Sequence, residues 1–364
     1  MQIPLDEEQA TFASVVREVL VRTDPPGERT FDPGTWAQLV AGGFLDAVSA
    51  DEPGGTVFLG LLAEEVGRAA NPVPVTASVV LAGHALSAAG ADEDQVAALR
   101  GGHRLAALLL DVGQAWETPV FGLATGGDQL VVSGSCAAVL GAGIAEVWIV
   151  PARHLDGGTC LVRVDPAASG AHVARSHLDL TGTVATVTLE GCPATPLHTA
   201  RDVATALDAA FQRAALADAG EMVGAAQRCL DLTVAHLTTR RQFGRPIGTF
   251  QALQHRCAEL VVDIHAARSA VRWACRAADG GDPLSHLLVA GAQAVATRAL
   301  QRAAEECMQM HGGMGFTWEH DAHGQLRRAT SGRWRFGTAE VNLARIAGGL
   351  QVPAPPIDTS ASAR

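Results

Sequence analysis

Two amino acids are absent from this 364-residue chain: it contains no lysine and no tyrosine, so all 27 basic residues are arginines. Without lysine the chain can form neither a catalytic Schiff base nor the phosphate-binding lysine of a P-loop. The 38 acidic residues outnumber the basic ones and give a net charge of −11. This acidic balance argues against a nucleic-acid-binding surface.

Long uncharged apolar runs are also missing, so the sequence predicts no membrane-spanning helix. The first residues, MQIPLDEEQ, begin acidic and lack the basic and then apolar order of a signal peptide. The seven cysteines are scattered, odd in number and form no CxxC motif. We therefore expect small buried thiols in a reducing compartment, and a cytoplasmic protein.

The hydrophobic pattern divides the chain into three regions and a tail. Residues 1–103 have helical spacing, in which Asn71, Pro72 and Pro74 end one helix before another over residues 76–89. Residues 104–200 hold short β-prone runs, at 105–112, 129–132, 147–150, 159–164 and 184–189. Residues 201–350 contain long helical patterns typical of an antiparallel four-helix bundle. Residues 351–364, rich in Pro, Ser and Ala, are expected to be disordered.

The stretch RRQFGRPIGTFQ, residues 240–251, interrupts two of these long helical patterns. It carries glycines and a proline, which indicate a structured turn rather than a continuous helix. An arginine fork, a glutamine amide and a flat ring on such a turn suit a ligand with both a phosphate and a planar group. A simple helix-to-helix corner is the other interpretation of the same residues.

This stretch resembles the RxQFGxPIxxFQ signature of the acyl-CoA dehydrogenase family, and QMHGGMGFTWEHD at residues 309–321 resembles a second signature of that family. The resemblance implies an all-helical N-terminal domain, a small β middle domain and a C-terminal helical bundle. It also implies FAD, bound partly by residues that reach the flavin of a neighbouring subunit. Those residues would be Arg240, Gln242, Phe243, Gln309, Gly312 and Gly313. Gly312 and Gly313 could instead serve only as a helix C-cap.

The family's catalytic glutamate is missing from both positions where the resemblance would place it. In RFGT, residues 335–338, Phe336 stands where the family has glutamate, and on the helix before residue 240 the corresponding residue is Ala214. Neither side chain can accept a proton. The loop and strand that hold the flavin ring in the family also look altered, and we expect Trp116 and Trp148 to be packing residues.

Glu221 is the candidate that could replace the missing base, with Asp218 a weaker one, because both follow Ala214 on the same helical face. The alternative for Glu221 is a salt bridge or an interface carboxylate. His320, Asp321 and His323 have spacing compatible with a metal site. The family has a similar run without a metal, so we expect no metal there.

The retained motifs are those with which a family member contacts the flavin of a neighbouring subunit. The missing residues are those with which a subunit acts on its own substrate. This pattern resembles the non-catalytic subunit of heteromeric acyl-CoA dehydrogenases, some of which act on steroid side-chain thioesters. We therefore expect an α2β2 hetero-oligomer with a catalytic homologue, FAD and an acyl-CoA substrate. Two alternatives are a self-sufficient homo-oligomer that uses Glu221 as base, and a non-redox scaffold or repurposed biosynthetic homologue.

Overall fold

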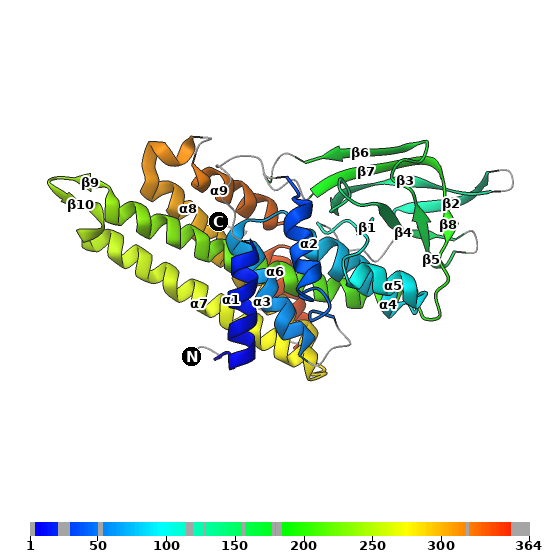
Figure 1. Ribbon diagram of the computed structural model, residues 1–364, viewed down its shortest axis with the longest axis horizontal. Coiled ribbons are helices and arrows are strands. Elements are labelled where there is room, and N and C mark those ends of the chain that lie inside the picture. Colours follow the sequence, from blue (N-terminus) through cyan, green and yellow to red (C-terminus); the bar gives the residue numbers. More distant parts are fainter. Residues whose placement is uncertain are drawn as a thin grey trace, which may run out of the picture.

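The computed structural model describes residues 4–20, 30–49, 54–113, 119–126, 129–154, 157–176, 179, 184–317 and 320–350. A helical region, a sheet and a second helical region follow one another along the chain, with the sheet at one end of the molecule and the long helices extending to the other (Figure 1). The predicted fold class is confirmed. Trp116 and the predicted disordered tail lie outside the described residues.

The N-terminal helices end where the sequence predicts a break. Helix α3 ends at Ala69, and Ala70 takes a left-handed conformation with φ of 48° before the Asn-Pro segment. The next predicted helix is present, but its first half, η1, is a π-helix that continues into α4. The helices are α1 (Glu7–Leu20), α2 (Pro33–Ala41), α3 (Gly55–Ala69), η1 (Val75–Gly83), α4 (His84–Ala88) and α5 (Glu93–Arg100).

Strands β1 to β8 form one sheet in the order β6-β7-β3-β2-β4-β5-β8, with β1 also paired to β4. The β1–β4 and β2–β4 pairs are parallel, and the other pairs are antiparallel. Each of the five predicted strands overlaps an observed one, whereas β2, β6 and β8 were not predicted. The strands are β1 (Ala106–Leu108), β2 (Phe121–Gly126), β3 (Gln129–Leu140), β4 (Val147–Arg153), β5 (Thr159–Val164), β6 (Ala171–Arg175), β7 (Val184–Pro193) and β8 (Thr195–Pro196).

The sheet has a hydrophobic core of its own, separate from the core of the helices. Trp148 lies fully buried in this core, and its indole Nε1–H donates to the carbonyl oxygen of Ala142 at 3.2 Å. A buried indole needs such a partner for its polar atom. The prediction that Trp148 is a packing residue is confirmed.

The C-terminal region is built on three long helices, of which α6 has 37 residues. Figure 1 shows α6, α7 and α8 running alongside one another. The shorter helices α9 and α10 pack against α8. No helix of the described chain is long and apolar enough to cross a membrane. The elements are α6 (Val203–Thr239), β9 (Arg241–Gln242), β10 (Arg245–Pro246), η2 (Ile247–Thr249), α7 (Gln251–Asp279), α8 (Ser285–His311), η3 (Gly312–Phe316), α9 (Asp321–Gly332) and α10 (Ala339–Gly349).

Helix α3 packs directly on α6, and two glycines permit the close approach. A Cβ at Gly224 would lie 1.8 Å from the carbonyl oxygen of Glu64, and one at Gly67 would lie 2.0 Å from that of Glu221. Neither position can accept a larger residue unless the helices separate. This contact brings α3 and the start of η1 beside the middle of α6, where Glu221 lies.

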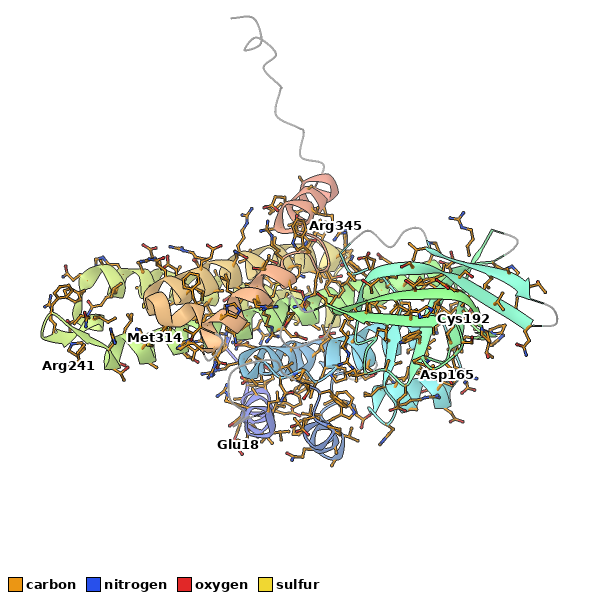
Figure 2. All side chains as sticks on the ribbon, turned by 90° about the horizontal axis from the view of Figure 1, so that it is seen from above. Glu18, Asp165, Cys192, Arg241, Met314 and Arg345 are labelled. Carbon is orange, nitrogen blue, oxygen red and sulfur yellow. The ribbon has the colours of Figure 1, made fainter. Side chains whose placement is uncertain are left out.

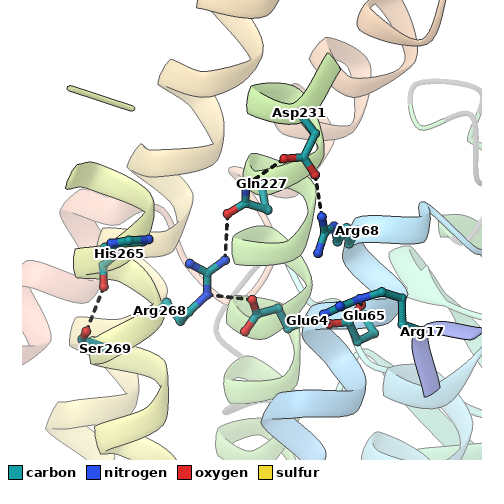
Figure 3. Close-up of polar contacts among 9 residues, drawn as sticks. All are labelled: Arg17, Glu64, Glu65, Arg68, Gln227, Asp231, His265, Arg268 and Ser269. Carbon is teal, nitrogen blue, oxygen red and sulfur yellow. Dashed lines mark hydrogen bonds and ion pairs between the residues drawn. The ribbon is translucent and has the colours of Figure 1, made fainter. Parts of the chain in front are cut away.

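Ion pairs fasten the N-terminal helices to the bundle beside this contact (Figure 3). Arg268 of α7 donates to Glu64 at 2.7 Å and to the Gln227 amide oxygen at 3.0 Å. Arg68 of α3 reaches Asp231 of α6 at 2.8 Å. Arg268 is 8% exposed, so its pairing keeps a charge satisfied within the interior.

All seven cysteines are free thiols, and five of them are buried. The expectation of small buried apolar residues holds for these five, whereas Cys160 and Cys257 are half-buried.

Candidate functional site

The stretch at 240–251 is a short β-hairpin at the tip of α6 and α7, at the end of the molecule opposite the sheet (Figure 1). Phe243 and Gly244 make the turn with φ of 51° and 76°. Such φ values are uncommon for a residue other than glycine, so the backbone of Phe243 is in an energetically unfavourable conformation. The backbone N–H of Ile247 donates to the carbonyl oxygen of Arg240 at 2.9 Å and closes the base of the hairpin.

The side chains of the hairpin face solvent. Phe243 is 89% exposed, and its ring meets that of Phe250 edge-on at 6.0 Å. Arg245 lies over the Phe250 ring, with its guanidinium carbon 4.2 Å from the ring centre. The Arg240 guanidinium has no hydrogen-bond or ion-pair partner among the described residues. An outward-facing guanidinium and a flat ring are what a phosphate and a planar group require.

The second motif forms a glycine turn at the same end of the molecule as this hairpin (Figure 2). Helix α8 ends at His311, and Gly312 is its C-cap with φ of 60°. Gly312 is therefore a helix C-cap, as the alternative interpretation predicted. The space above the turn is nevertheless open, because a Cβ at Gly312 or Gly313 would meet no atom within 4 Å. Arg241 and Met314 mark the hairpin and the turn at the same end of the molecule in Figure 2.

The residues predicted to hold FAD thus fit the phosphate-bearing half of a flavin nucleotide that approaches from outside the chain. All six are exposed, and they gather at one end from two elements far apart in sequence: Arg240, Gln242, Phe243, Gln309, Gly312 and Gly313. Glu221 is not brought near them. It lies 19 residues before Arg240 on α6, which is about 28 Å along a helix.

The two positions of the missing base are filled by hydrophobic contacts. Ala214 and Phe336 are fully buried. The Phe336 ring packs edge-on against that of Phe211 at 5.0 Å, and its backbone N–H donates to the carbonyl oxygen of Val112 at 2.6 Å. Phe336 has φ of 55°, so this buried contact also holds a strained backbone.

Glu221 forms a largely buried ion pair with Arg328 of α9. Its Oε2 is 3.1 Å from the Arg328 Nη2, and its Oε1 accepts from the Thr76 hydroxyl at 2.6 Å. Arg328 also donates to the carbonyl oxygen of Gly67 at 3.0 Å. Glu221 therefore forms a salt bridge, as the alternative interpretation of this residue predicted.

Asp218 makes a second buried pair one turn earlier on α6. Its Oδ1 lies 2.9 Å from the Arg335 Nη2, and its Oδ2 accepts from the Gln293 amide at 2.9 Å. Burial raises the pKa of Asp218 to about 6, although the positive charge of Arg335 opposes the shift. Arg335 also faces Asp179 at 4.0 Å, so two carboxylates balance its charge.

The two ion pairs line one small cavity, with room of about 30 Å³ for water. This volume suits about two water molecules. Asn71 also lines the cavity, 3% exposed, and neither polar atom of its amide has a partner among the described residues. An unpaired buried amide beside a polar cavity is a normal place for bound water.

The residues considered for a metal have other roles. His320 caps α9, because its Nδ1 accepts from the backbone N–H of Ala322 at 3.1 Å. Asp321 forms an ion pair with Arg228 at 2.8 Å.

Comparisons with known proteins agree with this fold and these motifs. The family described as acyl-CoA dehydrogenase, C-terminal domain, matches residues 204–351. Acyl-CoA dehydrogenase FadE27 of Mycobacterium tuberculosis is 30% identical over 339 residues, which is 88% of each chain. The chain belongs to the acyl-CoA dehydrogenase family.

Two further proteins are similar to this chain, one in sequence and one in structure. Acyl-CoA dehydrogenase IpdE2 of Mycobacterium tuberculosis is 50% identical over 116 residues, 32% of this chain and 35% of that protein. The chain therefore matches only about a third of the length of IpdE2. A chain in the crystal structure of the ChsE4-ChsE5 complex from Mycobacterium tuberculosis is similar with a TM-score of 0.80 and 25% identity, covering 98% of this chain and 100% of that one.

Sequence reasoning missed the arginines of the cavity. Arg328 and Arg335 come from α9 and the loop after it, more than a hundred residues from their carboxylate partners. The sequence indicated them only through the segments LRRA and RWRFGT, in which arginines lie near Phe336, the residue at the position of the missing base.

Proposed function

We propose that this chain is a subunit of an FAD-dependent acyl-CoA dehydrogenase that lends its hairpin and glycine turn to a flavin bound by a catalytic homologue. The pair would form a hetero-oligomer, of α2β2 composition, that desaturates an acyl-CoA thioester at its α,β bond. One observation carries the proposal. The family's FAD residues are exposed at one end of the chain, whereas the positions of the catalytic base, Ala214 and Phe336, are fully buried. Ala214 lies 26 residues before Arg240, which is about 39 Å along a helix.

FAD supplies the acceptor for the hydride from Cβ when a base removes the proton from Cα of the thioester. The residues of this chain would bind and orient that group rather than react. Arg240 presents a planar fork of donors suited to a pyrophosphate. Gly312 and Gly313 leave room for a ligand to approach the backbone.

The interior supports a non-catalytic role. A missing general base lowers the rate by about a hundred- to ten-thousand-fold. Glu221 could replace it only if it left Arg328, which would leave a buried arginine unpaired. The ChsE4-ChsE5 complex, which contains two named components, adds support for a paired assembly of this fold.

The test is the flavin content of the pair formed with a co-expressed catalytic homologue. Arg240→Ala should weaken FAD binding about tenfold or more, because a charge-assisted hydrogen bond contributes about 1.5–3 kcal/mol. Arg153→Ala is the matched control, since it removes an exposed arginine from β4 in the sheet. Equal FAD binding in both variants would refute the proposal.

The self-sufficient homo-oligomer remains the second candidate, because Glu221 and Asp218 both line the interior cavity. It predicts that Glu221→Gln abolishes turnover by the chain alone while FAD stays bound. The lending role predicts that the same variant of the pair keeps its turnover. A non-redox scaffold would contain no flavin with or without a partner.

A further inference from the structure

Three histidine rings stack at the end of the molecule that carries the hairpin and the glycine turn. The His311 ring lies between those of His236 and His320, with ring centres 4.4 Å apart on each side. His236 belongs to the last turn of α6, His311 ends α8, and His320 precedes α9. His311 is 6% exposed, so the middle ring is enclosed.

Hydrogen bonds fix how two of these rings are oriented. The Nδ1 of His311 lies 2.7 Å from the carbonyl oxygen of Cys307, which can only accept, so this nitrogen carries a proton. The Nδ1 of His320 accepts from the backbone N–H of Ala322 and therefore carries none. His311 is thus held by its own helix and stacked against two others.

The stack lies directly behind both segments proposed to contact the flavin. The carbonyl oxygen of His236 accepts from the backbone N–H of Arg240 at 2.9 Å, at the start of the hairpin. His311 immediately precedes Gly312, the first residue of the glycine turn. We propose that His311 is a positioning residue of the flavin site, which sets the distance and angle between the hairpin and the glycine turn. This inference rests on the proposed function.

Charged and titratable groups act on the stack from each helix around it: Arg240 from the end of α6, Cys307 from α8, and Asp321 from α9. Burial opposes a charge on His311, but the hydrogen bonds with Cys307 outweigh it and raise the pKa of His311. Burial and then the charge of His311 lower the pKa of His236, and the same two causes lower that of His320. His311 is therefore the ring that gains a proton first as pH falls.

This order predicts a pH effect that a purely structural residue would not produce. A proton on His311 adds positive charge behind two segments that hold an anionic pyrophosphate. FAD affinity should therefore rise as pH falls through the raised pKa of His311. Between two partly buried charges the gain should be about three- to tenfold.

The experiment measures FAD binding by the flavin-depleted pair, formed with the catalytic homologue, at pH 8 and pH 6. His311→Leu removes both the ring and its nitrogen, whereas His311→Phe keeps a flat ring between the two imidazoles. At pH 8 His311→Leu should weaken FAD about tenfold, while His311→Phe stays within about threefold of the unaltered pair. Both variants should lose the extra affinity that the unaltered pair gains at pH 6.

The inference would be overturned if the His311→Phe pair bound FAD with both the affinity and the pH dependence of the unaltered pair. This outcome can be measured even if His311→Leu fails to fold. The Arg240→Ala pair separates this result from the proposed function. If Arg240→Ala weakens FAD and the His311 variants do not, only the positioning role fails. If Arg240→Ala also has no effect, the lending role itself fails.

Discussion

The middle of α6 and its C-terminal end differ in how their polar groups are satisfied. In the middle, the buried Asp218 and the largely buried Glu221 are each paired with an arginine. At its C-terminal end, Arg240 and the hairpin are exposed, and the Arg240 guanidinium has no partner among the described residues. Polar groups that a fold uses internally are paired, whereas groups kept for a ligand are left open. Under the proposed function, the paired groups stabilise this chain and the open groups bind the flavin of its partner.

The largest effect on the closed interior should come from breaking its ion pair. Arg328→Leu leaves Glu221 unpaired and removes the bond to the Gly67 carbonyl, so the unfolding free energy should fall by about 3–5 kcal/mol. Urea unfolding measures this, and Arg328→Leu combined with Glu221→Leu should regain part of the loss. The exposed Arg302, paired with Asp263, is the control, and Arg302→Ala should have a far smaller effect. Equal losses at the two arginines would remove the contrast between interior and surface.

The pKa of Asp218 gives the next largest effect. Its pKa in the folded chain, about 6, lies above its ordinary value of 3.8, so folding favours the protonated form. The stability that this group contributes is present below about pH 4 and is lost as pH rises through 6, a change of about 3 kcal/mol at most. Asp218→Asn should remove this slope. Parallel pH profiles of unfolding for the variant and the unaltered chain would show that Asp218 titrates normally.

The fold was largely predictable where local residues decide the structure. The Asn-Pro segment at 71–74 ends α3 as expected, because proline cannot continue a helix. Strands β4, β5 and β7 have β-branched runs that predict them. Strands β2 and β6 were missed because FGLATG and AHVAR contain few such residues. The π-helix η1 packs against both α6 and β1, and no local sequence pattern indicated its π-helical form.

The candidate site was predictable in part for the same reason. The hairpin and the glycine turn are local motifs, and their residues could be named from the text alone. The pairs that close the interior join α6 to α9 and to the loop beyond it, so no local pattern indicates them. The stack around His311 likewise joins three helices that meet only in the folded chain.

Neighbouring glycines allow a smaller test at the open end. Gly312 has φ of 60° and ψ of −141°, a conformation that other residues avoid, so Gly312→Ala should cost about 1–3 kcal/mol of stability. Gly313 has no positive φ and open space, so Gly313→Ala should fold normally. Both should weaken FAD binding by the pair. If Gly313→Ala binds FAD normally, the space above the turn is not used by the ligand.

The smallest effect on stability should come from Phe243, which is 89% exposed. Phe243→Ala should leave the unfolding free energy of the lone chain within about 0.5 kcal/mol, as is usual for surface substitutions. The same variant should weaken FAD binding by the pair severalfold, because a large exposed ring contributes when a ligand covers it. A loss of stability without a loss of FAD affinity would make Phe243 a structural residue.

The most direct test of the lending role is the flavin absorbance and native mass of the chain purified alone and then with a co-expressed catalytic homologue. The account predicts a colourless lone chain and a yellow hetero-oligomer with about one FAD for every two chains, since each flavin site would need residues of both the catalytic homologue and this chain. A lone chain that is yellow with one FAD per subunit would contradict it. That result would make Glu221 and Asp218 the residues to test for catalysis.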